Sequence, residues 1–319
     1  MTALWQAPPA PLQRVSCAWL EAAGVELALL RLDLVDPLLS GNKWYKLAPH
    51  LIEARRLGAP GLISLGGAHS NHLHALAVAG ARFGLASVGL LRGEPQDTPT
   101  VRDLAAFGMR LHWLGYAGYR QRHRADFWDA WRQRYPGFVT VEEGGASLAA
   151  AQSCAGLVEL IGQGLGVLGW DDYQQLWVAA GTGTTLAGLV LGEAGRHPVV
   201  GCLAVPADHG VAETLQRLLA QAGQGADGRW RLRDASRGGF ARLDGELARL
   251  ILDFERETGV ALEPLYTGKL LLALREALAR GEIAAGSRIV AVHSGGLQGR
   301  RALEARLQAL AGLTPSSDR

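Results

Sequence analysis

One lysine near the start of the chain stands where an amine could act as a nucleophile. Lys43 lies in Ser-Gly-Asn-Lys-Trp-Tyr-Lys, residues 40–46, whose polar residues are typical of a helix start and precede a helical pattern to about residue 57. The helix dipole and an apolar cleft would both lower the pKa of this lysine and free its amine to attack an aldehyde. Lysine is scarce, since the 32 basic residues include only Lys43, Lys46 and Lys269. This scarcity makes chemistry that arginine cannot do as good an explanation of these lysines as an ordinary surface role.

A second segment, residues 66–74, places polar side chains between a predicted strand and a predicted helix. It reads Gly-Gly-Ala-His-Ser-Asn-His-Leu-His, so Ser70 and Asn71 present a hydroxyl and an amide at a helix start, where anions are stabilised. A simple helix cap is the alternative. The three histidines have no acidic or cysteine partner and no i, i+4 spacing, so no metal site is expected.

A third segment, Ala-Gly-Thr-Gly-Thr-Thr at residues 180–185, follows an apolar run and opens a helical pattern. Backbone N–H groups and hydroxyls at a helix start form a phosphate-binding cup. A tight strand–helix turn without a ligand is the alternative interpretation of the same pattern. No Gly-Lys-Ser/Thr follows, which excludes a nucleoside-triphosphate loop. A dinucleotide-binding fingerprint is matched only loosely, by Gly181, Gly183 and Gly188 with Asp208 beyond the next strand. The third of these glycines comes later in the sequence than the fingerprint requires.

Two shorter segments complete the candidates. Residues 266–269 read Tyr-Thr-Gly-Lys and residues 293–296 read His-Ser-Gly-Gly. Each alone is compatible with a turn or a helix cap. After a buried strand, however, the hydroxyl of Ser294 could meet a heteroaromatic nitrogen.

Composition bounds the class of protein. With 319 residues, 48% of them hydrophobic and 19% charged, the chain can bury one large core or two medium ones. Basic and acidic residues are interspersed and the net charge is only +2. The sequence therefore shows no basic patch of the kind that binds nucleic acid. Three scattered cysteines, no export signal and no apolar run of about 20 residues predict a cytoplasmic protein without a membrane span.

Short apolar runs alternate with longer amphipathic ones, which predicts an α/β fold. We expect two open, mostly parallel twisted sheets with helices on both faces. The expected strands are residues 27–32, 61–65, 87–91, 110–114, 137–141, 175–180, 199–205 and 288–293. The clearest expected helices are residues 73–83, 146–161, 185–193, 243–255 and 268–279.

Four glycine-rich strand exits give the expected position of the site. In open α/β sheets, ligands bind beyond the carboxyl ends of the strands, so these exits could meet in one cleft between two lobes. We expect a large cofactor-binding domain from residues 1–55 and 145–319, and a smaller α/β domain from residues 56–144 inserted in it. The exits are residues 66–67, 144–145, 181–183 and 295–296.

Together, these segments resemble the family of 1-aminocyclopropane-1-carboxylate deaminases and D-cysteine desulfhydrases. This family belongs to the tryptophan-synthase-β-like, fold type II pyridoxal-phosphate enzymes. The likeness runs from about residue 11 to residue 297 in the same order. Gly-Asn-Lys-x-x-Lys-Leu is its most specific motif, followed by Gly-Gly-x-x-Ser-Asn.

The resemblance implies a role for each motif residue, with pyridoxal 5′-phosphate as the cofactor. Lys43 would hold the cofactor covalently, and Lys46 would lie near its phosphate. Asn71 would bond its phenolic oxygen, and Ser294 would face its pyridine nitrogen. The phosphate would be held by Gly181, Thr182, Gly183, Thr184 and Thr185. The substrate side would include His69, Ser70, His72, Phe240, Tyr266 and Thr267, with Lys43, Ser70 and Tyr266 as the catalytic residues.

Three departures from the family bear on the substrate. Relatives carry Ile-Gln before Ser-Asn, where this chain has Ala68-His69, and a tyrosine of theirs aligns with Phe240. Position 267 is Thr, as in the desulfhydrases, where the deaminases have Glu. The chain therefore lacks a phenol and a carboxylate that would be expected to transfer protons during opening of the cyclopropane ring.

The expected function is therefore β-elimination from a small amino acid, with D-cysteine giving pyruvate, sulfide and ammonia. A neutral hydroxyl at the pyridine nitrogen favours elimination over a long-lived carbanion. Deamination of 1-aminocyclopropane-1-carboxylate to 2-oxobutanoate and ammonia is the first alternative. A nicotinamide- or flavin-dependent oxidoreductase and a non-catalytic ligand sensor are alternatives of other classes. The family likeness suggests a homodimer.

Overall fold

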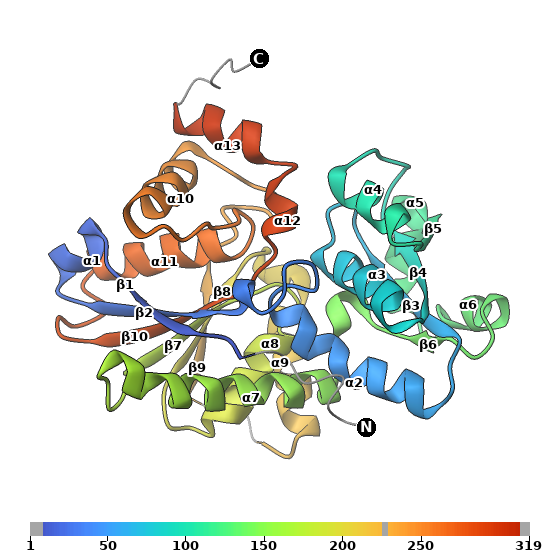
Figure 1. Cartoon of the computed structure of the whole chain (residues 1–319), viewed down its shortest axis with the longest axis horizontal. Coiled ribbons are helices and arrows are strands. Elements are labelled where there is room, and N and C mark those ends of the chain that lie inside the picture. Colours follow the sequence, from blue (N-terminus) through green and yellow to red (C-terminus); the bar gives the residue numbers. More distant parts are fainter. Residues whose placement is uncertain (1–8, 225–228, 313–319) are drawn as a thin grey trace.

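The computed structural model describes residues 9–224 and 229–312, which form two lobes, each built on its own sheet (Figure 1). In these ranges the larger sheet has the strand order β1-β2-β10-β7-β8-β9, with β1 antiparallel to β2 and all other pairs parallel. The smaller sheet, β5-β4-β3-β6, is entirely parallel. The strands are β1 (Leu12–Val15), β2 (Glu26–Arg31), β3 (Gly61–Gly66), β4 (Ala86–Leu91), β5 (Arg110–Trp113), β6 (Val139–Thr140), β7 (Gln175–Ala180), β8 (Val199–Leu203), β9 (Trp230–Asp234) and β10 (Arg288–His293).

Helices cover both faces of the larger sheet, as buried parallel strands require. One face packs against α7 (Leu148–Leu165), α8 (Thr184–Glu193) and α9 (Val211–Gln221). The other face packs against α1 (Ala18–Ala23), α10 (Gly245–Thr258), α11 (Thr267–Ala279) and α13 (Glu304–Ala311). The short α12 (Leu297–Arg300) follows the exit of β10.

The smaller sheet is covered in the same way. Its inner face joins the main buried cluster through α3 (Asn71–Phe83) and α4 (Pro99–Ala106). Its outer face carries a separate aromatic cluster beside α5 (Gly115–Arg120) and α6 (Asp129–Arg134). Single 3₁₀ turns lie at η2 (Leu32–Leu34), η3 (Gln121–His123), η4 (Glu143–Gly145), η5 (Gly166–Leu168) and η6 (Ala207–His209).

Helix α2 (Asn42–Arg56) connects the lobes and contributes to the core that they share. Leu47 and Leu51 are buried in the same apolar cluster as Leu76 of the small lobe and Leu157 of the large lobe. Pro49 lies inside α2 and does not end it. The predicted division at residues 55 and 145 stays a prediction, although all four strands of the smaller sheet fall between residues 61 and 140.

The predicted elements all form, with shifted ends. The strand expected at 137–141 shortens to the two residues of β6, and the helix expected to end at residue 161 continues to Leu165. The edge strands β1 and β9 were missed. Trp-Arg-Leu-Arg-Asp in β9 carries charges that an edge strand can turn to solvent, so it lacks the continuous apolar run of a central strand. Within the described ranges, no helix has the length and apolarity to cross a membrane.

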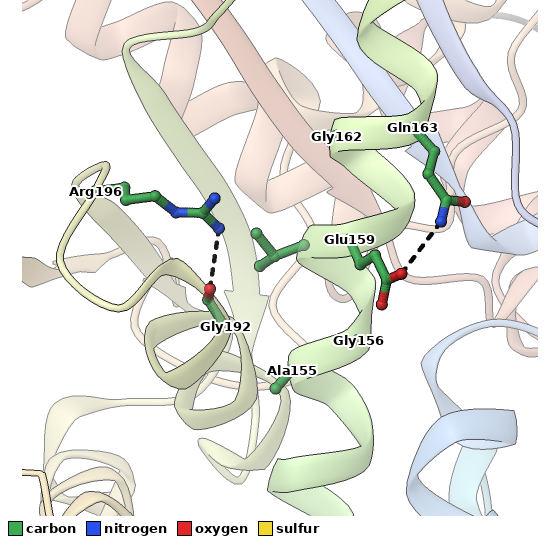
Figure 2. A pocket seen from close by; sticks show the side chains of 8 residues that line it. Ala155, Gly156, Glu159, Gly162, Gln163, Gly192 and Arg196 are labelled. Atoms are coloured by element: carbon green, nitrogen blue, oxygen red, sulfur yellow. Dashed lines mark hydrogen bonds between the residues drawn. The ribbon is translucent and has the colours of Figure 1, made fainter.

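Helices α7 and α8 lie against each other at glycine positions. A Cβ added at Gly188 would lie 2.4 Å from the Ala151 carbonyl oxygen and 2.5 Å from Cβ of Cys154. Gly156 of α7 instead faces the open hollow between these helices, where an added Cβ would meet nothing (Figure 2). Gly188 therefore permits a close contact between the two helices, whereas Gly156 makes no such contact.

This contrast gives a stability prediction. We expect Gly188→Ala to lower the free energy of unfolding by about 1–3 kcal/mol, because the helices must separate to admit the methyl group. Gly156→Ala should raise it by about 0.5–1 kcal/mol, since alanine loses less backbone entropy in a helix. Urea unfolding of both variants measures the difference. Equal effects of the two substitutions would contradict the close contact at Gly188.

Candidate active site

The helix that carries Lys43 begins directly against the exit of β10. Gly41 has a φ of +73°, and a Cβ there would lie 1.9 Å from the carbonyl oxygen of Ser294. The Asn42 backbone N–H donates to that same oxygen at 3.1 Å. Only glycine combines this left-handed φ with so close a backbone approach. Lys43 is thereby fixed beside the Ser294-Gly295 turn.

Two side chains of α2 tie its first turn to the glycine-threonine loop after β7. The Asn42 amide donates to Oγ1 of Thr185 at 2.9 Å, and Nζ of Lys46 donates to Oγ1 of Thr182 at 3.3 Å. Gly183 has a φ of +82° and is the N-cap of α8, whose first backbone N–H groups have no partner inside the helix. Lys46 therefore lies at an N-terminal anion site of the kind that binds phosphate.

The two lysines of α2 form a buried concentration of positive charge. Lys46 is only 2% exposed, and Lys43, one helical turn earlier, is mostly buried and donates to Oδ1 of Asn42 at 3.0 Å. Burial lowers the pKa of Lys43 to about 8, against weaker opposing effects of Cys154 and Glu263. Burial and then repulsion by Lys43 lower the pKa of Lys46 well below its ordinary value. No described carboxylate forms an ion pair with either lysine, so an anionic ligand would relieve a real electrostatic cost.

The small lobe contributes the start of α3. Ser70 caps this helix, its Oγ accepting the Leu73 N–H at 3.1 Å. Asn71 reaches across to the large lobe, where its Oδ1 accepts from Gln298 at 2.7 Å and its amide packs against Gly296. His69 is exposed just before them. Asn71 thus lies beside Gly296, two residues after Ser294, at the exit of β10.

Two aromatic rings lie on the other side of the glycine-threonine loop. Phe240 and Tyr266 pack edge to face with ring centroids 5.4 Å apart. A Cβ at Gly181 would lie 2.9 Å from a ring carbon of Tyr266, so the ring presses on the loop backbone. Burial raises the pKa of the Tyr266 phenol, which stays protonated at neutral pH. The next residue, Thr267, is completely buried.

His72 faces the interior of the small lobe. Its Nε2 lies 2.8 Å from Oγ of Ser64, whose hydroxyl donates to the Val141 carbonyl at 2.7 Å. Since that hydroxyl proton is used, Nε2 carries the ring proton and Nδ1 is left without a partner. Nδ1 faces Gly145, near Lys46. A contact between His72 and a substrate stays a prediction.

Sequence reasoning missed Glu263. Its carboxylate accepts the backbone N–H groups of Leu265, Tyr266 and Thr267 at 2.8, 2.9 and 2.5 Å. Burial raises its pKa to about 7, against these hydrogen bonds. An acidic residue three positions before Tyr266, at the start of a helical pattern, was the available signal. Glu263 fixes the turn that presents Tyr266.

These contacts join the predicted motifs at one place between the lobes. The segment around residue 43 touches those of residues 181–185 and 294, and the segment of residues 181–185 touches Tyr266. Asn71 joins the group from the small lobe through Gln298. The hollow in Figure 2 lies elsewhere, between α7 and α8, and is lined by none of the predicted site residues. Within the described part of the chain, no three histidine, cysteine or acidic side chains gather as a metal-binding group.

Comparison with known proteins adds three findings. The family model described as pyridoxal-phosphate dependent enzyme matches residues 2–295. A putative 1-aminocyclopropane-1-carboxylate deaminase of Pyrococcus horikoshii is 27% identical over 92% of this chain and 90% of its own, and a D-cysteine desulfhydrase of Salmonella typhi is 28% identical over 86% and 87%. The crystal structure of a 1-aminocyclopropane-1-carboxylate deaminase homologue superimposes with a TM-score of 0.82 at 24% identity, covering 96% of this chain and 97% of that one.

The buried lysines predict a stability effect that needs no substrate. The pKa of Lys43 falls from an ordinary 10.5 to about 8, so the unfolded chain binds the extra proton between these values. The resulting penalty is complete below about pH 8 and fades as the pH rises towards 10.5. In cofactor-free protein at pH 7, Lys43→Met should raise the thermal midpoint by a few degrees, at roughly 2–4 °C per kcal/mol.

The control is Arg217→Met, which removes an exposed cation from α9. We expect no comparable gain from it, and we expect the gain from Lys43→Met to shrink between pH 8 and 10.5. Scanning calorimetry across this range measures both. An unchanged or lower midpoint for Lys43→Met at pH 7 would mean that the charge is already compensated.

Proposed function

Since the chain belongs to the pyridoxal-phosphate dependent enzymes, we propose that it eliminates a β-substituent from a small amino acid, with D-cysteine as the preferred substrate. The observation that carries this proposal is a pair of buried lysines beside a helix start rich in hydroxyls, neither of them ion-paired to a carboxylate of residues 9–224 or 229–312. The family match leaves no support for the oxidoreductase or the non-catalytic sensor. The reaction would convert D-cysteine and water into pyruvate, sulfide and ammonia.

The residues fit pyridoxal 5′-phosphate. The first turn of α8, with Thr184 and Thr185, and the ammonium of Lys46 would hold the phosphate. Lys43, as an amine of lowered pKa, would bind the aldehyde covalently. Ser294 would face the ring nitrogen. When bound, the cofactor supplies an electron sink for the charge left on the α-carbon.

Side chains and backbone groups of the protein supply the proton transfers and the binding of the substrate carboxylate. When its amine is free, Lys43 would be a base with a pKa of about 8 and would take the α-proton. The N-terminus of α3, capped by Ser70, offers backbone N–H groups to the substrate carboxylate. Tyr266 remains protonated and can donate to a leaving group.

The choice between substrates rests on Phe240 and Thr267. Neither carries a group that titrates, so neither can move a proton during opening of a cyclopropane ring. This favours a thiol leaving group. The relatives named as deaminases and as desulfhydrases have nearly equal identity to this chain and do not decide the matter.

For location and assembly we propose the cytoplasm and a homodimer. The three cysteines are buried and unpaired, which suits a reducing compartment. The dimer is what the family likeness suggests, and sedimentation of the purified protein tests it.

Replacing each of the two lysines by alanine in turn tests which amine binds the cofactor. Lys43→Ala should abolish the violet-region absorbance of the bound cofactor and lower turnover by at least roughly a thousandfold, because the proposed covalent link is lost. Lys46→Ala should keep that absorbance and raise the cofactor concentration needed for saturation. Absorbance titration with pyridoxal 5′-phosphate measures both. The reverse result, with Lys46 required and Lys43 dispensable, would refute the assignment.

Separate assays on D-cysteine and the cyclopropane amino acid test the substrate. We expect kcat/KM for pyruvate formation from D-cysteine to exceed that for 2-oxobutanoate formation by at least about tenfold, or about 1.4 kcal/mol. Lys43→Ala serves as the blank. Faster 2-oxobutanoate formation would reverse the ranking, and no product from either would remove both substrates while leaving the family unchanged.

A further inference from the structure

The third lysine of the chain is buried in a cage of backbone oxygens. Lys269 is 1% exposed, and its Nζ lies 3.2 Å from the carbonyl oxygen of Ala204, 2.9 Å from that of Ser236, and 2.8 Å from those of Gly239 and Phe240. An ammonium has three N–H donors, so four oxygens exceed what it can bond one to one. The arrangement is closer to the coordination of a monovalent cation by carbonyl dipoles.

This cage joins the ends of two neighbouring parallel strands, β8 and β9, to the first turn of α11. Ala204 follows β8, and Ser236, Gly239 and Phe240 belong to the loop after β9. That loop has a backbone cost at Arg237, a non-glycine residue with a left-handed φ of +58°. A charge at the centre of the carbonyls offsets that cost.

The loop held by Lys269 delivers one of the two rings at the substrate side. The Phe240 carbonyl is a ligand of the ammonium, and the Phe240 ring packs on Tyr266. Lys269 also lies on the first turn of α11, immediately after Tyr266. One ammonium therefore fixes both rings relative to each other and, through Tyr266, relative to Gly181.

We propose that Lys269 is a positioning residue that acts as a built-in monovalent cation, so that its removal leaves a site for a free ion of similar size. The proposal rests on the proposed function only for its activity readout. A cavity of about 350 Å³ beside Lys269 gives such an ion a route. Its lining includes three carboxylates, those of Asp234, Asp244 and Glu276, and one guanidinium, that of Arg237, which pairs with Asp244 and Glu276.

Three full-length proteins, each with cofactor, test the proposal: wild type, Lys269→Ala and Lys269→Met. Alanine opens the cage to an ion, whereas methionine removes the same charge but fills the space. Thermal midpoints are compared in potassium, ammonium and tetramethylammonium chloride at equal ionic strength, the last cation being too large to enter. We expect potassium and ammonium to raise the midpoint of Lys269→Ala saturably by several degrees, with little change in the other two proteins.

Turnover of D-cysteine gives the second readout, with potassium as the main probe because ammonium is a product. We expect both variants to keep the cofactor absorbance and to lose at least tenfold in kcat, and Lys269→Ala alone to recover part of it in potassium. Recovery of folded Lys269→Ala only in potassium or ammonium would count as the same result.

Three outcomes would overturn the proposal. They are an equal response of Lys269→Ala and Lys269→Met to potassium, stabilisation of Lys269→Ala without recovery of kcat, and full activity of Lys269→Met. If the wild type turns over neither substrate, the proposed function fails, and the thermal comparison still decides whether the cage accepts a cation.

Discussion

The structure depends on two mostly buried ammonium groups, one helical turn apart, that form no ion pair with a carboxylate in the described part of the chain. Lys43 and Lys46 lie on the same face of α2, and burial lowers the pKa of both. Such an arrangement costs stability in the isolated chain. It is useful only if an anion and an electrophile complete it, and the first turn of α8 offers the place for that anion.

The rest of the fold serves to place these charges. Parallel strands of both sheets end near one place, where Gly144 lies against Thr182 and Gly296 lies against Asn71. The contact of Gly41 with Ser294 fixes the start of α2, and Asn71 brings the small lobe to the same point. Glu263 and Lys269, of opposite charge, then fix the turn and the loop that carry Tyr266 and Phe240.

Local sequence was enough to predict the central strands and the helices between them. Continuous apolar runs identify buried parallel strands, and the scarcity of lysine singled out Lys43. The edge strands β1 and β9 escaped because half of an edge strand faces water and its pattern is diluted by charge. The roles of Glu263 and Lys269 escaped for another reason. Both depend on backbone groups brought together by the fold, and the oxygens around Lys269 come from residues up to 65 positions away. The direction of His72, towards Ser64, depends likewise on a strand that the motif does not contain.

The account depends most directly on which side chain is joined to the cofactor. Borohydride reduction of the protein as purified, followed by proteolysis and mass spectrometry, identifies that residue covalently and needs no substrate. We predict a single pyridoxyl adduct on the peptide that contains Lys43. An adduct on Lys46 or Lys269, or none in protein that retains its violet-region absorbance, would contradict the central assignment.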